Sequence, residues 1–139
     1  MDRVFLDADI LFSASWRADA GLLQLWTLRN MELITSEYAC EEARRNLAGA
    51  DQEERLRKLI SSVVVVGDAP PDFPLHVDLD EKDRPILRAA VQAGATHLLT
   101  GDKSHFGSLY GKLVGGVLIL LPGDYLLQRA KPRRRRPKA

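Results

Sequence analysis

The stretch RVFLDADIL, residues 3–11, decides the fold of this chain. Its first part, Arg3 to Asp7, is typical of a strand buried on both faces, because apolar residues follow one another instead of alternating with polar ones. Similar short runs recur further along the chain, at residues 32–35, 63–66, 96–100 and 117–121. Helical patterns separate these runs, and strands joined through helices need crossover connections. The sequence therefore predicts an α/β fold, a three-layer α/β/α sandwich with a mainly parallel central sheet.

The helical patterns are defined by apolar spacing and by end signals. They lie within residues 21–29, from Ser36 to about residue 47, near 51–60, and from about residue 83 to Gly94. Asp51 with Glu54 three residues later predicts a capping box for the third helix. Gly94 predicts the end of the fourth. A proline-rich loop is expected over residues 67–79.

Length and composition predict one compact domain. The chain has 139 residues, of which 45% are hydrophobic, enough for a single core. Its longest apolar runs are strand-sized, well short of the roughly 20 residues that span a bilayer. The first residues lack the pattern of a secretory signal, so a cytoplasmic protein is expected. Cys40 is the only cysteine, which excludes an internal disulfide.

Charge is distributed unevenly along the chain. The whole chain carries +1, and residues 131–139, KPRRRRPKA, hold six basic residues and no acid, which leaves −5 on residues 1–130. Two prolines and four consecutive arginines cannot bury enough apolar surface to fold. We therefore expect a domain over 1–130 and a basic disordered tail over 131–139, in which arginine suits contact with phosphate.

Four carboxylates occupy comparable positions. Asp7 and Asp102 end or closely follow apolar runs, and Glu42 and Asp83 lie on helix-like segments. The carboxyl ends of parallel strands share one edge of the sheet, where residues distant in sequence can meet. Carboxylate oxygens are the ligands that Mg²⁺ and Mn²⁺ prefer, so the set predicts a metal site.

Each acid also has a structural interpretation. Asp7 can cap the following helix, although Asp9 is available nearby for that role. Gly101-Asp102 is a turn-forming pair. Asp83 precedes a proline and suits a helix N-cap. Periodicity does not separate Glu42 from Glu41.

Four segments in order resemble the successive motifs of PIN-domain ribonucleases, including their VapC-like toxin branch. These segments are FLDADIL (5–11), Ser36 followed six residues later by Glu42, DRPIL (83–87) and LTGDK (99–103). The resemblance covers about residues 3–122.

The resemblance implies a metal-dependent endoribonuclease. Asp7, Glu42, Asp83 and Asp102 would be its catalytic acids and would hold Mg²⁺ or Mn²⁺, and Thr100 would order the site. RNA hydrolysis would leave 5′-phosphate and 3′-hydroxyl ends. The family usually has Asn two residues after its first Asp, whereas this chain has Asp9, which adds a negative charge beside the metal. The toxin branch further implies an antitoxin partner, and a homodimer is expected.

An acidic domain repels RNA, so basic residues must line the approach. The candidates are those next to the acids and those in the tail: Arg44, Arg45, Arg84, Lys103, Arg133, Arg134, Arg135 and Arg136.

Two other functions are consistent with parts of the sequence. Asp7-Ala8-Asp9 also resembles the nucleophile motif of haloacid-dehalogenase-like phosphatases, in which Asp7 would be phosphorylated and Asp9 would act as acid and base. The other alternative is a non-catalytic PIN-like domain that binds RNA or a protein partner through its tail.

Overall fold

The structure is a computed structural model that describes residues 1–101 and 103–130. Its strands are β1 (Asp2–Leu6), β2 (Met31–Ser36), β3 (Val64–Val66), β4 (His97–Leu99), β5 (Leu113–Val114) and β6 (Val117–Leu120). Its α-helices are α1 (Ala8–Ser15), α2 (Glu37–Asn46), α3 (Ala50–Ile60), α4 (Arg84–Gln92), α5 (Lys103–Phe106) and α6 (Pro122–Ala130). Two 3₁₀ helices, η1 (Gly21–Thr27) and η2 (Gly107–Leu109), complete the described elements.

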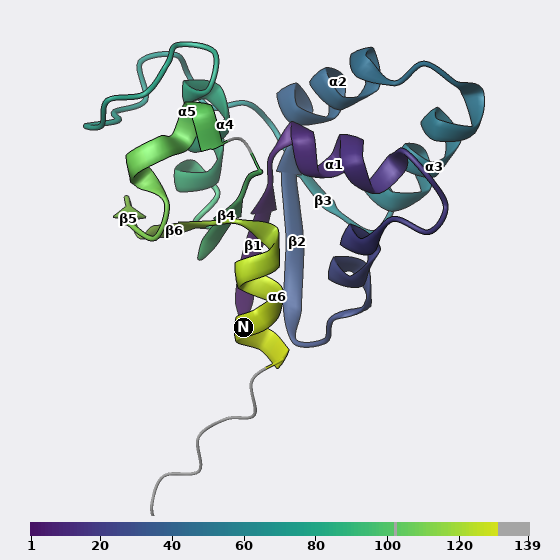
Figure 1. Ribbon diagram of the computed structural model, residues 1–139. Coiled ribbons are helices and arrows are strands. Elements are labelled where there is room, and N and C mark those ends of the chain that lie inside the picture. The colour runs from purple at the N-terminus through teal and green to yellow at the C-terminus, as the bar shows by residue number, and fades with distance from the viewer. Residues whose placement is uncertain (102, 131–139) are drawn as a thin grey trace, which may run out of the picture.

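The strands form one sheet in the order β3-β2-β1-β4-β6-β5, in which only the short β5 runs antiparallel to its neighbour. The predicted three-layer, mainly parallel α/β/α fold is confirmed. Figure 1 shows α1, α2 and α3 grouped on one side of β1 and β2 and α4 on the other. Strand β5 had no signal of its own in the sequence. It is formed by a two-residue hairpin at Gly115 and Gly116, whose φ angles of 56° and 84° match a hairpin turn.

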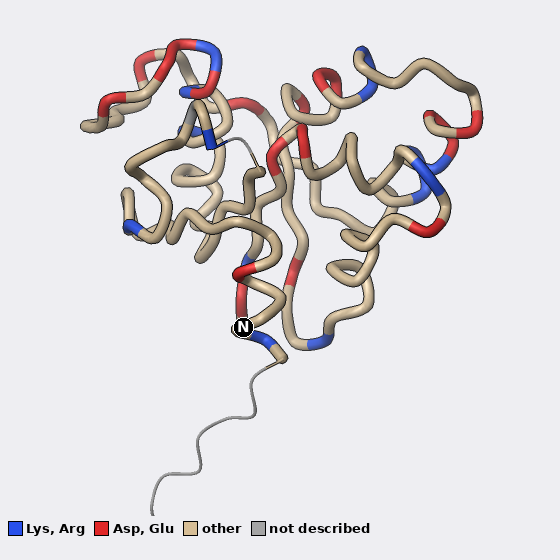
Figure 2. Tube along the Cα trace, viewed as in Figure 1, with Lys and Arg blue, Asp and Glu red and all other residues tan. Residues whose placement is uncertain are grey.

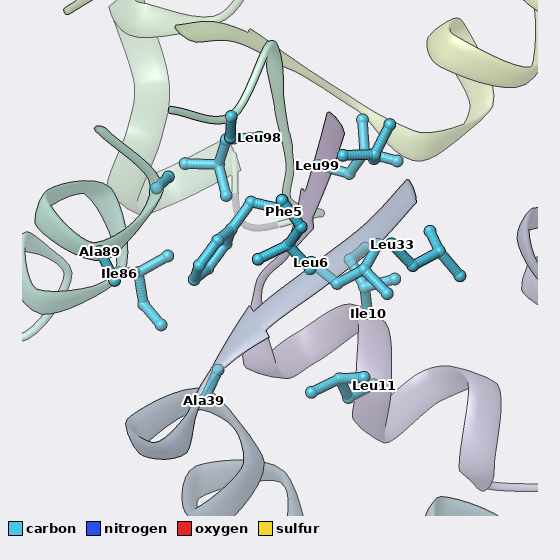
Figure 3. Packing of buried hydrophobic residues seen from close by; sticks show 14 of the residues in the cluster. Phe5, Leu6, Ile10, Leu11, Leu33, Ala39, Ile86, Ala89, Leu98 and Leu99 are labelled. Carbon is cyan, nitrogen blue, oxygen red and sulfur yellow. The ribbon is translucent and has the colours of Figure 1, made fainter. Parts of the chain in front are cut away.

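The core explains the continuous apolar runs. Val4, Phe5 and Leu6 of β1 are each 0% exposed, because helices cover both faces of this central strand. In Figure 3, Phe5 points toward Ile86 of α4, whereas Ile10 of α1 lies on the opposite side of β1. Alternate side chains of one strand thus fill two separate helix–sheet layers.

The helices differ from the sequence prediction in several details. Helix α3 begins one residue before Asp51 with Gly49 at its N-cap, so the predicted capping box is wrong, and Glu54 instead pairs with Arg57 at 2.5 Å. Helices α1 and α6 were not predicted. The segment at residues 21–29 is helical, but as the 3₁₀ helix η1. Gly94, with φ of 69°, follows the end of α4 as expected.

The site edge of the sheet lies between β1 and β4. From β1 the chain moves outward through β2 and β3, then returns across the sheet to β4 on the other side of β1. The segments that leave β1 and β4 therefore diverge, which opens a crevice at the carboxyl ends of these strands. The two strands stay joined up to that point, where the Asp7 amide donates to the Leu99 carbonyl at 3.1 Å.

Candidate active site at the carboxyl edge of the sheet

Asp7 is the anchor of the site. It ends β1 and is the N-cap of α1, where its Oδ1 accepts a 2.6 Å hydrogen bond from the Ala8 amide. Its Oδ2 accepts a 2.8 Å hydrogen bond from the Thr100 hydroxyl just after β4. The side chain is only 8% exposed. Asp7 itself, rather than Asp9, therefore caps the helix, which is the structural role that the sequence allowed for it.

Burial disfavours the charged form of the Asp7 carboxyl. It raises the pKa of this carboxyl to about 7, and the neighbouring charges of Asp9 and Asp83 act in the same direction. The hydrogen bonds from Thr100 and Ala8 oppose this rise but do not cancel it. A positive charge placed beside Asp7 would relieve this repulsion, as a divalent cation does.

Asp9 fastens the end of β4 to the start of α1. Its Oδ2 accepts a 2.8 Å hydrogen bond from the Gly101 amide, across 92 positions of sequence. A Cβ atom at residue 101 would lie 3.0 Å from that same oxygen, so a side chain there would press on the Asp9 carboxylate. The backbone after β4 is thus held by Asp9 at a place where glycine is the best fit.

Geometry separates Glu42 from Glu41. Glu42 lines the same cleft as Asp7. Glu41 points elsewhere: it pairs with Arg44 at 2.7 Å and lines a different cavity, of about 610 Å³, between α2 and α3. The ambiguity that periodicity left is therefore resolved by the direction of the two side chains.

Asp83 stands at the N-cap position of α4, but its side chain makes no capping hydrogen bond there. Instead it lines the cleft with Asp7, and its Oδ2 atom is buried. Its position is therefore not explained by helix capping, the structural role that the sequence suggested for it.

These acids share one cleft of about 440 Å³, lined among others by Asp7, Asp9, Glu42 and Asp83. Figure 2 shows acidic positions at the start of α1, on α2 and along the segment leading into α4, at the same end of the sheet. The fourth expected acid, Asp102, lies outside the described residues. Three segments far apart in sequence thus bring carboxylates to a single hollow.

The donor set suits a hard divalent cation, which takes oxygen ligands and retains several waters. Burial and the charges of Asp9 and Asp83 raise the pKa of Asp7, and a bound cation would offset both effects. Within residues 1–101 and 103–130, no three His, Cys, Asp or Glu side chains converge closely enough to hold an ion by themselves. A cleft of this size instead fits an ion that keeps part of its water shell.

The cleft contains residues that sequence reasoning missed: Phe12, Tyr38, Asn46 and Lys82. Tyr38 is the most informative of them. Its hydroxyl donates to the Lys82 carbonyl at 3.3 Å, and burial and the charge of the nearby Glu42 raise its pKa. It lies four residues before Glu42 on α2, and this one-turn spacing was the available signal.

The candidate basic residues lie in different places. Arg84 donates to the backbone carbonyls of Leu75 and Val77, each at 3.2 Å, which gives it a structural role in the loop before α4. Arg44 is paired with Glu41, as described above. Arg45 is exposed, and its charge acts on Tyr38 at the cleft.

Lys103 is exposed at the start of α5. Arg133, Arg134, Arg135 and Arg136 lie outside the described residues. Lys82, which sequence reasoning did not select, is the lysine that lines the acidic cleft.

An α/β domain with an acidic cleft at the switch point of its sheet defines the structural class of this protein. Residues 3–104 match the PIN domain family, and the chain belongs to that family. Membership of this family assigns the chain to the nucleases. A search of curated proteins finds no match.

Among solved structures, the fold is similar to VapC20 of Mycobacterium tuberculosis, described as a sarcin-ricin loop cleaving toxin. The two have 15% sequence identity and a TM-score of 0.51, and the match covers 73% of this chain and 92% of VapC20. At this identity the likeness supports the fold alone. No helix in the described part of the chain is long and apolar enough to cross a membrane.

Proposed function

We propose that this chain is an endoribonuclease that hydrolyses RNA phosphodiester bonds with Mg²⁺ or Mn²⁺. The observation that carries the proposal is the shared cleft of Asp7, Glu42 and Asp83, three acids supplied by three separate segments. These residues, with Asp102 after β4, are the proposed catalytic and metal-binding groups. A bound divalent cation would lower the pKa of an attacking water and neutralise charge on the phosphodiester.

The protein's own groups prepare the site. Thr100 and the Ala8 amide hold the two oxygens of Asp7 in fixed directions. Tyr38 lies near Glu42. Such supporting hydrogen bonds orient ligands before the cation arrives, so less reorganisation is needed on binding. Lys82 and Arg45 are placed to offset the negative charge that repels RNA.

The match of residues 3–104 to the PIN domain supports the nuclease over the phosphatase alternative. Asp9, the acid and base of that alternative, accepts a hydrogen bond from the Gly101 amide.

The fold is shared with the toxin VapC20, and we propose more specifically that this chain is the toxin of a toxin–antitoxin pair and acts on cytoplasmic RNA. An antitoxin protein would then be its inhibitor, and a homodimer its working form. Light scattering of the purified protein measures the oligomeric state, and a monomer at working concentration would contradict the homodimer.

The test of the nuclease proposal is incubation of the purified protein with structured and unstructured RNAs. We expect cleavage with Mn²⁺, none with chelator, and none with Glu42→Gln or Asp102→Asn. Glu41→Gln is the matched control and should cleave normally, because Glu41 is turned toward Arg44. Cleavage that persists in chelator and in both site variants would overturn the proposal.

A further inference from the structure

Helix α1 links the acidic cleft to a second hollow. Its N-cap, Asp7, lies in the acidic cleft, and its C-cap, Trp16, lines a separate hollow of about 370 Å³. Phe12, between them, lines both. The helix is only about 12 Å long at 1.5 Å per residue. A chain molecule that occupies the acidic cleft can therefore continue along α1 into the second hollow.

The second hollow has an aromatic wall. Phe12 and Trp16 are one helical turn apart, with ring centroids separated by 5.2 Å and planes inclined by 44°. Trp16 is 47% exposed. Trp26, in contrast, is half-buried and donates from its indole to the Leu59 carbonyl, so the exposed indole is a particular feature of Trp16.

The aromatic wall is held in place from behind. Arg55 of α3 donates to the carbonyl of Ser15 at 2.9 Å and to that of Trp16 at 3.0 Å. Gln52 donates to the same Trp16 carbonyl at 3.3 Å. The end of α1 is thus anchored on α3, and a ligand that stacks on Trp16 meets a backbone that is already ordered.

The size and the charge of the hollow suit a nucleotide. The hollow is of a size that small ligand groups fill, and unpaired bases stack on aromatic rings largely regardless of sequence. Arg17 also lines it, with its side chain 70% exposed and an ion pair to Asp19 at 3.4 Å. Such an exposed pair is weak, so a phosphate group can compete with Asp19 for this guanidinium.

We propose that Phe12, Trp16 and Arg17 form a base-stacking subsite that binds an unpaired nucleotide of the RNA strand whose phosphodiester lies in the acidic cleft. The inference rests on the proposed function and adds to it a binding site for one base of the RNA strand outside the acidic cleft. In a duplex, the bases are stacked on each other and cannot enter such a hollow.

The test measures binding of a short fluorescent single-stranded RNA and of the same sequence as a duplex, with Asp7→Asn in every protein to prevent cleavage. Trp16→Ala should raise the Kd for the single strand by about 5- to 150-fold, the usual effect of losing one stacked base. Trp16→Phe should raise this Kd by a smaller factor, because an aromatic ring remains for stacking. Leu113→Ala is the control, since Leu113 is 71% exposed on β5, distant from α1 in the sheet order.

A second readout does not depend on the alanine variant. With Trp26→Phe, Trp16 is the remaining tryptophan, and its emission should be quenched by the single strand more than by the duplex. Equal Kd values for Trp16→Ala and Leu113→Ala, equal losses for single strand and duplex, or emission unchanged by RNA would each overturn the subsite.

The outcomes also separate the subsite from the nuclease proposal. Trp16-dependent RNA binding without any cleavage by the unaltered protein would leave the subsite standing and remove the nuclease. Cleavage with the same KM in the unaltered protein and in Trp16→Ala would do the reverse. RNA binding unaffected by Trp16→Ala, together with lost binding of a purified protein partner, would assign the surface to that partner and overturn the subsite.

Discussion

The Thr100 hydroxyl donates a 2.8 Å hydrogen bond to Oδ2 of Asp7, although 93 positions separate the two residues. Both are buried, and they stand just beyond the paired ends of β1 and β4. The contact therefore exists only because these two strands are neighbours at the switch point of the sheet. It fixes the least exposed acid of the cleft, and several predictions depend on it.

Removing the Thr100 hydroxyl should lower activity or Mn²⁺ affinity without leaving a cavity. Thr100→Val keeps the shape of the side chain but leaves Oδ2 of Asp7 without its donor. We expect a loss of about 10- to 100-fold in activity or Mn²⁺ affinity, as for other residues that orient metal ligands. RNA cleavage at a series of Mn²⁺ concentrations measures this. Thr100→Ser retains the hydroxyl and should stay close to wild type; an equal loss in both variants would contradict the role of the hydrogen bond.

The raised pKa of Asp7 predicts how stability depends on pH. Because the pKa is about 7 in the folded protein and about 4 in the unfolded chain, the folded state binds more protons between these values. The metal-free protein should therefore lose stability as pH rises from about 4 to 7, by at most about 4 kcal/mol.

Thermal melts of wild type and of Asp7→Asn across this range measure the effect. The variant should lack this loss, and Mn²⁺ should restore much of it in the wild type at pH 8, because a ligand of the native state stabilises it. Asp19→Asn, at an exposed position, is the control. A wild-type profile that is flat between pH 4 and 7 would show that Asp7 is not perturbed.

Two adjacent glutamates provide a matched pair. Glu42→Gln should reduce cleavage by at least about 100-fold if it removes a metal ligand, since metal-assisted steps depend on the full ligand charge. Glu41→Gln changes the same chemistry one residue away but affects only exposed ion pairs, with Arg44 at 2.7 Å and with Arg45 at 3.9 Å, which contribute little. Single-turnover rates compare them, and equal losses would contradict the assignment of Glu42.

Two substitutions of Asp9 separate the effect of its charge from the effect of its hydrogen bond with the Gly101 amide. Asp9→Asn retains an oxygen that can accept from the Gly101 amide, whereas Asp9→Ala does not. We expect Asn to preserve activity and to shift the lower limb of the pH–rate profile to lower pH, because one charge that raises the pKa of Asp7 is gone. Ala should lose activity. Equal losses in Asn and in Ala would show that the charge of Asp9, not its hydrogen bond, is what the site needs.

Tyr38 should act through Glu42. Tyr38→Phe keeps the ring in the cleft and removes the hydroxyl that lies near Glu42 and donates to the Lys82 carbonyl. A hydrogen bond of this kind is worth about 0.5–1.5 kcal/mol, so kcat should fall by roughly 2- to 10-fold. Measuring kcat and KM separately decides the point: a change confined to KM would mean that the hydroxyl contacts RNA instead.

Much of the fold was predictable because its signals are local. Continuous apolar runs such as residues 3–7 predict central strands, and glycine at 94 predicts a helix end. The failures were local as well: the Asp51–Glu54 pattern satisfied a capping box that the helix does not use. Helix α1 was not among the predicted helical patterns, although Asp7 was a possible cap for a following helix. Asp7 ends β1, caps α1 and lines the cleft.

The sequence by itself determined the α/β class and the positions of the candidate acids, because strand and helix periodicities are properties of neighbouring residues. Only the tertiary structure decided that Glu42, not Glu41, faces Asp7, that Asp83 is not used as a cap, and that Tyr38 and Trp16 line the hollows along α1. The physical reason is that these relationships depend on crossovers that bring distant segments to one edge of the sheet. The residues that flank a side chain in the sequence do not indicate which partner it meets across such a crossover.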